Sequence, residues 1–88
     1  MDDRPQREMP RYQSHKQVWA LKIKELKEPL PSGDCMFLPE EEGYDWVFLP
    51  KDFMEKHQPK VGGYYVVYKD GYKSFSPAQA FEEGYTKV

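Results

Sequence analysis

Few side chains in this 88-residue sequence are of a type that could carry out catalysis or hold a metal ion, and their spacing favours neither. The two histidines are His15 and His57, and no pair of potential ligands around them has a spacing recognisable as a metal site. Cys35 is the single cysteine, which excludes an internal disulfide and a zinc cluster of cysteines. We therefore expect no metal and no cofactor, and we interpret Cys35 as a small core residue.

The carboxylates are grouped in runs, which is unlike a catalytic pair. Glu40–Glu42 and Glu82–Glu83 have the composition of solvated surface, whereas acid–base catalysis needs two carboxylates in different environments. Gly62-Gly63 precedes a strand pattern and so lacks the strand-to-helix setting of a phosphate-binding loop. We expect a bulge or a close backbone approach there. Because no nucleophile has a recognisable base, the sequence predicts a protein that is not an enzyme.

Tyrosine is the residue type that points most clearly to binding. The chain has seven tyrosines, more than a small core needs, and tyrosine gives rigid contact area at low entropic cost. We predict an exposed ring cluster that binds a partner protein, with these candidates: Tyr64, Tyr65, Tyr68, Tyr72 and Trp46. For any single ring, the competing interpretation is core packing or an ordinary cross-strand pair. A rival hypothesis is a sheet that binds single-stranded nucleic acid, since lysines lie near these rings, namely Lys60, Lys69, Lys73 and Lys87.

Charge and composition disfavour nucleic acid and membranes as partners. The net charge is −2 and the isoelectric point is near 5.7, without the basic excess of a phosphate-binding domain. No apolar stretch approaches the length of a membrane span, and no N-terminal segment resembles a signal peptide, so we expect a cytoplasmic protein. Hydrophobic residues make up 39% of the chain and aromatic residues 16%, which predicts a small core rich in rings.

The elements that would position these residues amount to one domain over residues 15–88, preceded by a flexible arm over residues 1–14. The arm is polar, contains Pro5 and Pro10, and has no apolar period. From Lys16 to Ile23, apolar and polar residues alternate with a period of two, which indicates a strand. A helix is the competing interpretation, because good helix formers continue through this segment.

The middle of the chain predicts a hairpin and then a short helix. Residues 35–38 and 44–49 read as two strands, with Tyr44, Trp46 and Phe48 expected on one face of the second. Residues 50–57 begin with a proline at the first helical position and end with Lys56 and His57, as helix ends commonly do.

The C-terminal third predicts a hairpin followed by a capped helix. Residues 64–68 form a strand pattern, with Tyr64, Val66 and Tyr68 on one face. Asp70-Gly71 indicates a two-residue type I′ turn, which would place Tyr68 opposite Lys73. The helix would be capped by Ser76 with Pro77 at the first position and Gln79 in a capping box, and would end at a left-handed Gly84. The expected fold is α+β: a small antiparallel sheet of four or five strands with one or two short helices.

Two segments of the chain resemble a family of small proteins encoded by tailed bacteriophages and prophages. These are the segment from Tyr12 to Ile23, YQSHKQVWALKI, and the segment from Val61 to Tyr85 with its GGYYVVY, DGY, SP and AFEEGY elements. The resemblance brings no catalytic motif. It implies a phage accessory protein that binds a host or phage protein in the bacterial cytoplasm, with inhibition of a host factor or a defence system as one form of this role. An uncovered edge strand would also permit a homodimer.

Overall fold

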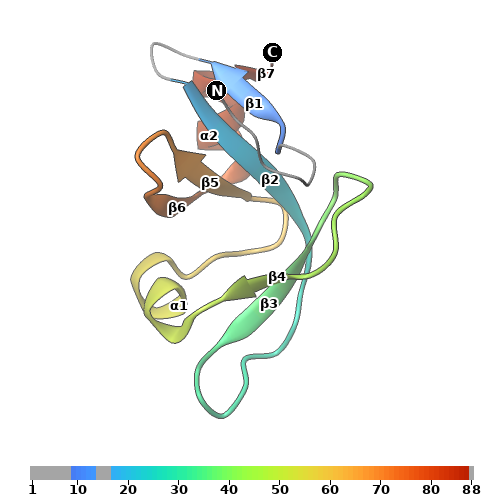
Figure 1. Cartoon of the computed structure of the whole chain (residues 1–88), viewed down its shortest axis with the longest axis vertical. Coiled ribbons are helices and arrows are strands. Elements are labelled where there is room, and N and C mark those ends of the chain that lie inside the picture. The colour runs from blue at the N-terminus through green and yellow to red at the C-terminus, as the bar shows by residue number, and fades with distance from the viewer. Residues whose placement is uncertain (1–8, 14–16, 88) are drawn as a thin grey trace.

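The computed structural model of the chain describes residues 9–13 and 17–87. Strands and helices follow one another in this part of the chain as β1 (Arg11–Gln13), β2 (Gln17–Leu26), β3 (Cys35–Pro39), β4 (Val47–Leu49), α1 (Lys51–His57), β5 (Tyr64–Tyr68), β6 (Lys73–Ser76), α2 (Ala78–Gly84) and β7 (Thr86–Lys87) (Figure 1). The predicted α+β class is confirmed. The five strands expected from the sequence correspond to β2–β6, and the structure adds the short strands β1 and β7.

The sheet has a Greek-key order that is organised around β2. Strands β2, β3 and β4 pair in succession, and β5 returns after α1 to pair with β2 on its way to β6. Every one of these pairs is antiparallel. A meander of three strands with a fourth beside the first is the definition of a Greek key. With β6 added beside β5, the strand order is β4-β3-β2-β5-β6, and the sheet is curled (Figure 1).

The long strand β2 is buried on both faces, which explains why its pattern could also be read as a helix. Val18 and Ala20 belong to one hydrophobic cluster, whereas Leu21 and Ile23 belong to the other. The ladder register shifts near Glu25, where β2 passes on to pair with β3. Such an irregularity bends a strand and increases its twist. The prediction of a strand in this segment is confirmed.

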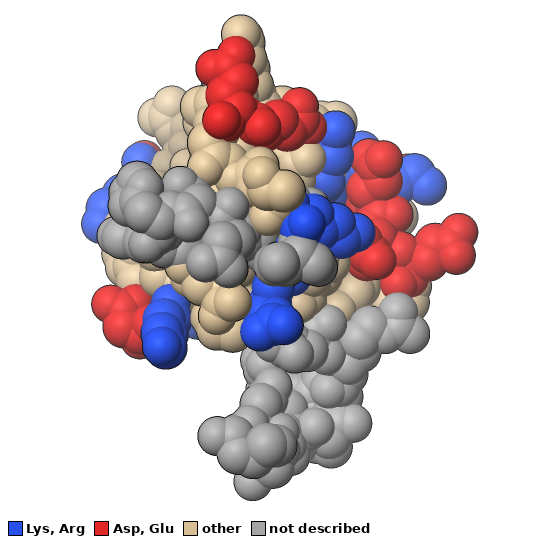
Figure 2. All heavy atoms as spheres, turned by 90° about the horizontal axis from the view of Figure 1, so that it is seen from above, with Lys and Arg blue, Asp and Glu red and all other residues tan. Residues whose placement is uncertain are grey.

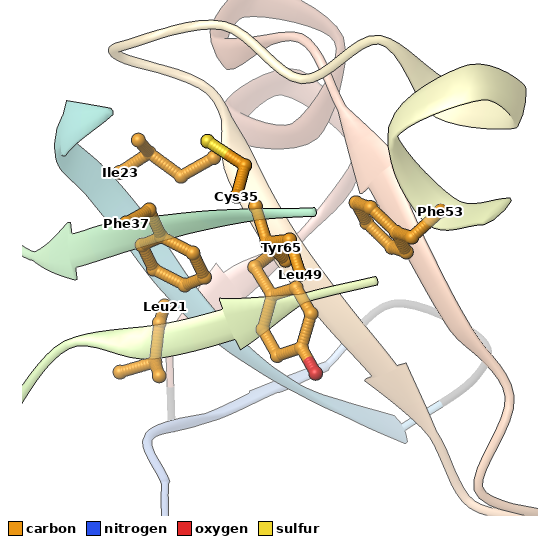
Figure 3. Packing of buried hydrophobic residues seen from close by; sticks show 7 residues of the cluster. All are labelled: Leu21, Ile23, Cys35, Phe37, Leu49, Phe53 and Tyr65. Atoms are coloured by element: carbon orange, nitrogen blue, oxygen red, sulfur yellow. The ribbon is translucent and has the colours of Figure 1, made fainter. Parts of the chain in front are cut away.

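The first hydrophobic cluster fills the inside of the curled sheet. Its buried members come from β2, β3, β4, α1 and β5, and Figure 3 shows them: Leu21, Ile23, Cys35, Phe37, Leu49, Phe53 and Tyr65. The ring of Tyr65 lies between two others, with centroids 5.2 Å from Phe37 and 5.7 Å from Phe53. Cys35 is buried as predicted, and its thiol donates to the Lys27 carbonyl at 2.9 Å.

The second cluster lies on the opposite face of β2 and β5 and is covered by α2. Its buried members are Val18, Ala20, Tyr64, Val66 and Phe81. The Phe81 ring stacks on Tyr64 with a centroid distance of 4.3 Å, and the clustering of Tyr64 with Val66 confirms the predicted face of β5. Burying one ring of this size contributes about 1.5–3 kcal/mol, so α2 depends on Phe81 for its attachment.

The β5–β6 hairpin differs by one residue from the predicted pairing. The backbone N–H of Tyr68 donates to the Tyr72 carbonyl at 2.8 Å, so the connecting loop consists of Lys69, Asp70 and Gly71. A type I′ turn needs positive φ at both central residues, whereas only Gly71 has it here, at 92°. The Asp70 carboxylate instead accepts the Tyr72 N–H at 3.0 Å, which favours the longer loop.

The predicted capping box at the start of α2 is wrong. Pro77 is the N-cap residue, and no side chain makes a capping hydrogen bond. Ser76 is the last residue of β6 and pairs with Tyr64, so the sheet holds it away from the helix end. The Gln79 side chain donates to Glu83 at 3.1 Å, one turn along the helix.

The helix ends also differ from expectation. Gly84 lacks the predicted left-handed conformation, because α2 passes directly into the extended Tyr85 (φ −133°). A left-handed residue ends α1 instead: Gln58 has a φ of 46° and donates its N–H to the Met54 carbonyl. Helix α1 matches its predicted range within one residue, with Pro50 as N-cap.

Two further segments depart from the sequence pattern. Arg11–Gln13, expected in the flexible arm, forms β1 and pairs with β2 and β7, whereas residues 1–8 and 14 lie outside the described residues. Strand β4 starts only at Val47, so Tyr44 and Trp46 do not share a strand face with Phe48 as predicted. The Trp46 N–H donates to the Asp45 carboxylate at 2.7 Å, a local bond that competes with the ladder.

We predict that Gly63→Ala destabilises the fold because β6 passes very close to Gly63. A Cβ atom there would lie 2.3 Å from the Phe75 ring, as expected for a close backbone approach. Overpacking of this kind costs about 1–3 kcal/mol, which urea denaturation would measure. Gly84→Ala is the matched control: its Cβ meets nothing within 4 Å, so its free energy of unfolding should be unchanged or slightly higher. Equal stability of the two variants would contradict the prediction.

Candidate functional site

The structure separates the five candidate rings by exposure. Tyr64 and Tyr65 are each 6% exposed and belong to the two hydrophobic clusters, whereas Tyr72 is 46% exposed. Tyr68 and Trp46 are half-buried. Core packing therefore accounts for Tyr64 and Tyr65, and the surface available to a partner centres on Tyr72.

Tyr64 has a structural role in addition to its burial. Its hydroxyl donates to the Glu82 carboxylate at 2.8 Å, and the Lys22 ammonium lies 3.3 Å from the same oxygen. The Tyr64 hydrogen bond and then Lys22 lower the pKa of Glu82 below its ordinary value. These contacts fix α2 on the sheet, so Glu82 is more than the solvated carboxylate that its sequence run indicated.

Tyr72 lies within a small group of rings and lysines that we call the hairpin-tip patch; its members are Lys56, His57, Tyr68, Lys69, Tyr72 and Lys73. The ring centroid of Tyr72 lies 5.9 Å from that of Tyr68 and 6.2 Å from that of His57. The Lys56 ammonium lies over the Tyr72 ring, 5.2 Å from its centroid. The patch thus joins the tip of the β5–β6 hairpin to the last turn of α1.

A hollow of about 650 Å³ adjoins the patch. It is lined by Gln17 of β2 and by hairpin residues, namely Tyr68, Lys69, Asp70 and Tyr72. Its size falls within the range of ligand-binding clefts. The Gly71 N–H donates to the Tyr68 carbonyl at 2.8 Å, and the Asp70–Tyr72 bond closes the other side of the loop, so the hairpin itself shapes this hollow.

The patch offers hydrogen-bond donors and positive charge. Burial, followed by the neighbouring Tyr85 and Tyr72, raises the pKa of Tyr68, so its hydroxyl stays protonated. Burial and then the adjacent Lys56 lower the pKa of His57, so its ring favours the neutral form. Lys56, Lys69 and Lys73 form no ion pair with any residue that the structure describes.

The arrangement of exposed rings beside lysines is of a kind found in binding surfaces. Within residues 9–13 and 17–87, no group of three His, Cys, Asp or Glu side chains could hold a metal ion. In the same part of the chain, no helix is long and apolar enough to span a membrane. His15 lies outside the described residues.

Sequence reasoning missed two members of the patch and one distant ring. The sequence pattern indicates Lys56 and His57 only as helix-end residues, whereas in the structure both lie beside the Tyr72 ring. Phe48 is 54% exposed on β4 and lies opposite Met36, away from the hairpin-tip residues in sequence and strand order. Trp46 pairs with a different lysine, the Lys27 ammonium lying 4.8 Å from its ring centroid. The structure therefore does not bring Trp46 into the patch.

The fold is a small Greek-key domain, and the hairpin-tip patch is its group of rings and lysines beside the hollow. No protein-family model matches the sequence, and no curated protein matches it. Among solved structures, the chain is similar to the solution structure of the monomeric form of the phage L decoration protein, with a TM-score of 0.69 and 24% sequence identity. The similarity covers 97% of this chain and 63% of that one, so the chain spans less than two-thirds of that protein's length. At this identity the likeness establishes a shared fold.

We predict that His57 makes folding stability depend on pH below its ordinary pKa. The folded state lowers the pKa of His57 from 6.5, so the unfolded chain binds the proton more readily. Stability is therefore fully present above about pH 6.5 and decreases as the pH falls through the lower, folded-state value. An NMR titration of the imidazole should show the lowered pKa, and Lys56→Gln should raise it. His57→Gln should lose this part of the pH dependence in urea denaturation, and an unchanged profile would contradict the assignment.

Proposed function

We propose that this chain is a non-catalytic phage accessory protein that attaches to a protein surface of the phage particle. The main support is its fold, which it shares over nearly its whole length with the phage L decoration protein. That neighbour is named as a decoration protein of a phage, which supports a role on the phage particle. The resemblance of the sequence to small phage and prophage proteins agrees with this setting.

The hairpin-tip patch is the surface we assign to this attachment. Tyrosine is enriched where binding energy concentrates in interfaces, and Tyr72 is the candidate tyrosine with the largest exposed fraction, 46%. Flanking lysines add charge complementarity, which mainly accelerates and orients association. The adjoining hollow would receive a side chain of the partner.

A finer hypothesis from the sequence is inhibition of a host factor or a defence system in the bacterial cytoplasm. It would use the same chemistry, a rigid surface that covers part of another protein, and it stays a prediction. Homodimer formation through an edge strand stays a prediction as well. Strand β6 is one such edge, although its four residues, Lys73 and the following Pro77 limit strand addition.

Single-stranded nucleic acid is the second candidate partner, and the Greek-key strand order is the observation that favours it. Some five-stranded Greek-key domains bind oligonucleotides, and these combine aromatic rings with basic grooves. The charge distribution disfavours it here. Among the residues coloured in Figure 2, acidic and basic side chains lie next to one another on the face shown. Fold alone does not decide between the two candidates.

The test is binding to particles of the phage or prophage that encodes the chain. Particles from a strain lacking the gene are mixed with the purified protein and sedimented through a density gradient, with and without nuclease. We expect the protein to sediment with the particles in both cases, because its contacts are with protein. Recovery with particles only in the absence of nuclease would favour nucleic acid, and no recovery would contradict the proposed attachment.

Matched variants assign the surface. Tyr72→Ala should lower the bound fraction at least about tenfold, the typical effect of removing an aromatic hot spot. Phe48→Ala removes a ring of similar exposure, 54% against 46%, and should bind as the unmodified protein does. Both variants should keep their thermal unfolding midpoints within a few degrees, since neither ring is buried. Loss of binding in Phe48→Ala alone would move the site to the β3–β4 face.

A further inference from the structure

We infer that the hairpin-tip patch recognises a carboxylate-rich segment of its partner protein. The inference rests on the proposed function and names the chemistry of the partner at the same site. It starts from the three lysines of the patch. Lys56 lies over the ring, Lys69 lines the adjoining hollow, and the Lys73 ammonium lies 3.5 Å from the Gly71 carbonyl.

These lysines differ from three others whose charges are already matched within the fold. Those three ion pairs are Lys22 with Glu82, Lys51 with Glu55, and Lys87 with Glu41. Lys56, Lys69 and Lys73, by contrast, have no acidic partner among the described residues. A negatively charged ligand could therefore pair with these ammonium groups without breaking an ion pair of the fold.

Asp70 follows Lys69 in the chain, yet it forms no ion pair with the three lysines. The Asp70 carboxylate accepts the backbone N–H of Tyr72 at 3.0 Å and is used in closing the loop. Ammonium donors beside a ring match carboxylates carried on short aliphatic stems, because the stems can pack on the ring while the oxygens meet the donors.

The extent of the patch favours an acidic protein segment over nucleic acid. A single-stranded nucleic acid binds along a groove that follows several phosphates, and its affinity depends on neutralising them in series. Here Lys56 lies over the exposed Tyr72 ring and Lys69 lines the adjoining hollow, in a chain whose net charge is −2. Neighbouring carboxylates, including Asp70 in the hollow and Glu55 on α1, would repel a longer phosphate backbone. A few carboxylates on a protein loop could bind the patch without extending over these neighbouring carboxylates.

The experiment titrates the full-length protein with defined peptides and follows its amide resonances by NMR. The acidic probe is a twelve-residue peptide of alternating Glu and Ala, the neutral probe has Gln in place of Glu, and the nucleic-acid probe is a twelve-residue oligothymidylate. We expect the Glu peptide to shift the amides of residues 56–57 and 68–73 at low salt. Its affinity should exceed that of the other two probes and fall several-fold at about 0.15 M salt.

Charge-reversal variants supply the matched comparison. Lys69→Glu should weaken binding of the Glu peptide about tenfold, whereas Lys24→Glu, which changes the net charge equally on the exposed end of β2, should change it less than twofold. Equal weakening by both variants would reduce the effect to overall charge and overturn the inference. Stronger binding of oligothymidylate at the same amides would assign the patch to nucleic acid instead, and absence of shifts at these residues would also overturn it.

The outcomes for the patch chemistry and for the proposed function are separable. If Lys69→Glu still sediments with phage particles while the Glu peptide fails to bind, the carboxylate inference fails and particle attachment stands. If the Glu peptide binds at the patch while no particle attachment occurs, the attachment fails and the recognised chemistry stands.

Discussion

The structure depends on burying β2 along both faces and pairing it along both edges. Leu21 and Ile23 contribute to the cluster inside the curled sheet, and Val18 and Ala20 contribute to the cluster beneath α2. On one side β2 pairs with β5, while β1 and β3 pair with successive parts of its length. A single strand therefore organises two cores, which lets a short chain with few hydrophobic residues bury its large rings efficiently.

Because both faces of β2 and β5 are covered, only some of the tyrosines remain exposed. Adjacent residues of β5 point to opposite faces, so Tyr64 enters one cluster and Tyr65 the other. The strand loses its cover toward the hairpin, where Tyr68 is half-buried and Tyr72 exposed. The exposure of the tyrosine rings therefore increases along the hairpin, from its base to its tip. The rings at its tip are held by the same ladder that buries the rings at its base, which gives the exposed surface a rigid support at little entropic cost.

The regular features of the fold could be predicted from local sequence, because alternation in β2 and β5 reports directly on their faces. The register of the hairpin could not be predicted in this way. Asp70-Gly71 is compatible with two loop lengths, and the choice depends on which of these residues adopts a positive φ. Ser76 looks like a helix cap in isolation, yet pairing with Tyr64 keeps it in the sheet. For the site, the sequence pattern proposed Tyr68 and Tyr72 as members of an exposed ring cluster, and in the structure their ring centroids lie 5.9 Å apart. It could not show that α2 covers Tyr64, or that α1 brings Lys56 and His57 to Tyr72, because both contacts join distant segments.

The architecture of the domain is compatible with very different partners, so the discrimination has to come from the patch. Stacking platforms for nucleic acid and docking surfaces for proteins both use exposed tyrosines, and the rings alone do not separate them. The spatial pattern of charge does separate the two kinds of partner. Phosphates repeat along a strand and require a basic track of matching length, whereas a protein loop presents a few carboxylates at one point. Lys56 over the Tyr72 ring and Lys69 at the adjoining hollow, with Glu55 and Asp70 next to them in the chain, match a few carboxylates more closely than a row of phosphates. In the proposed attachment, such a surface would gain specificity from charge and affinity from the ring.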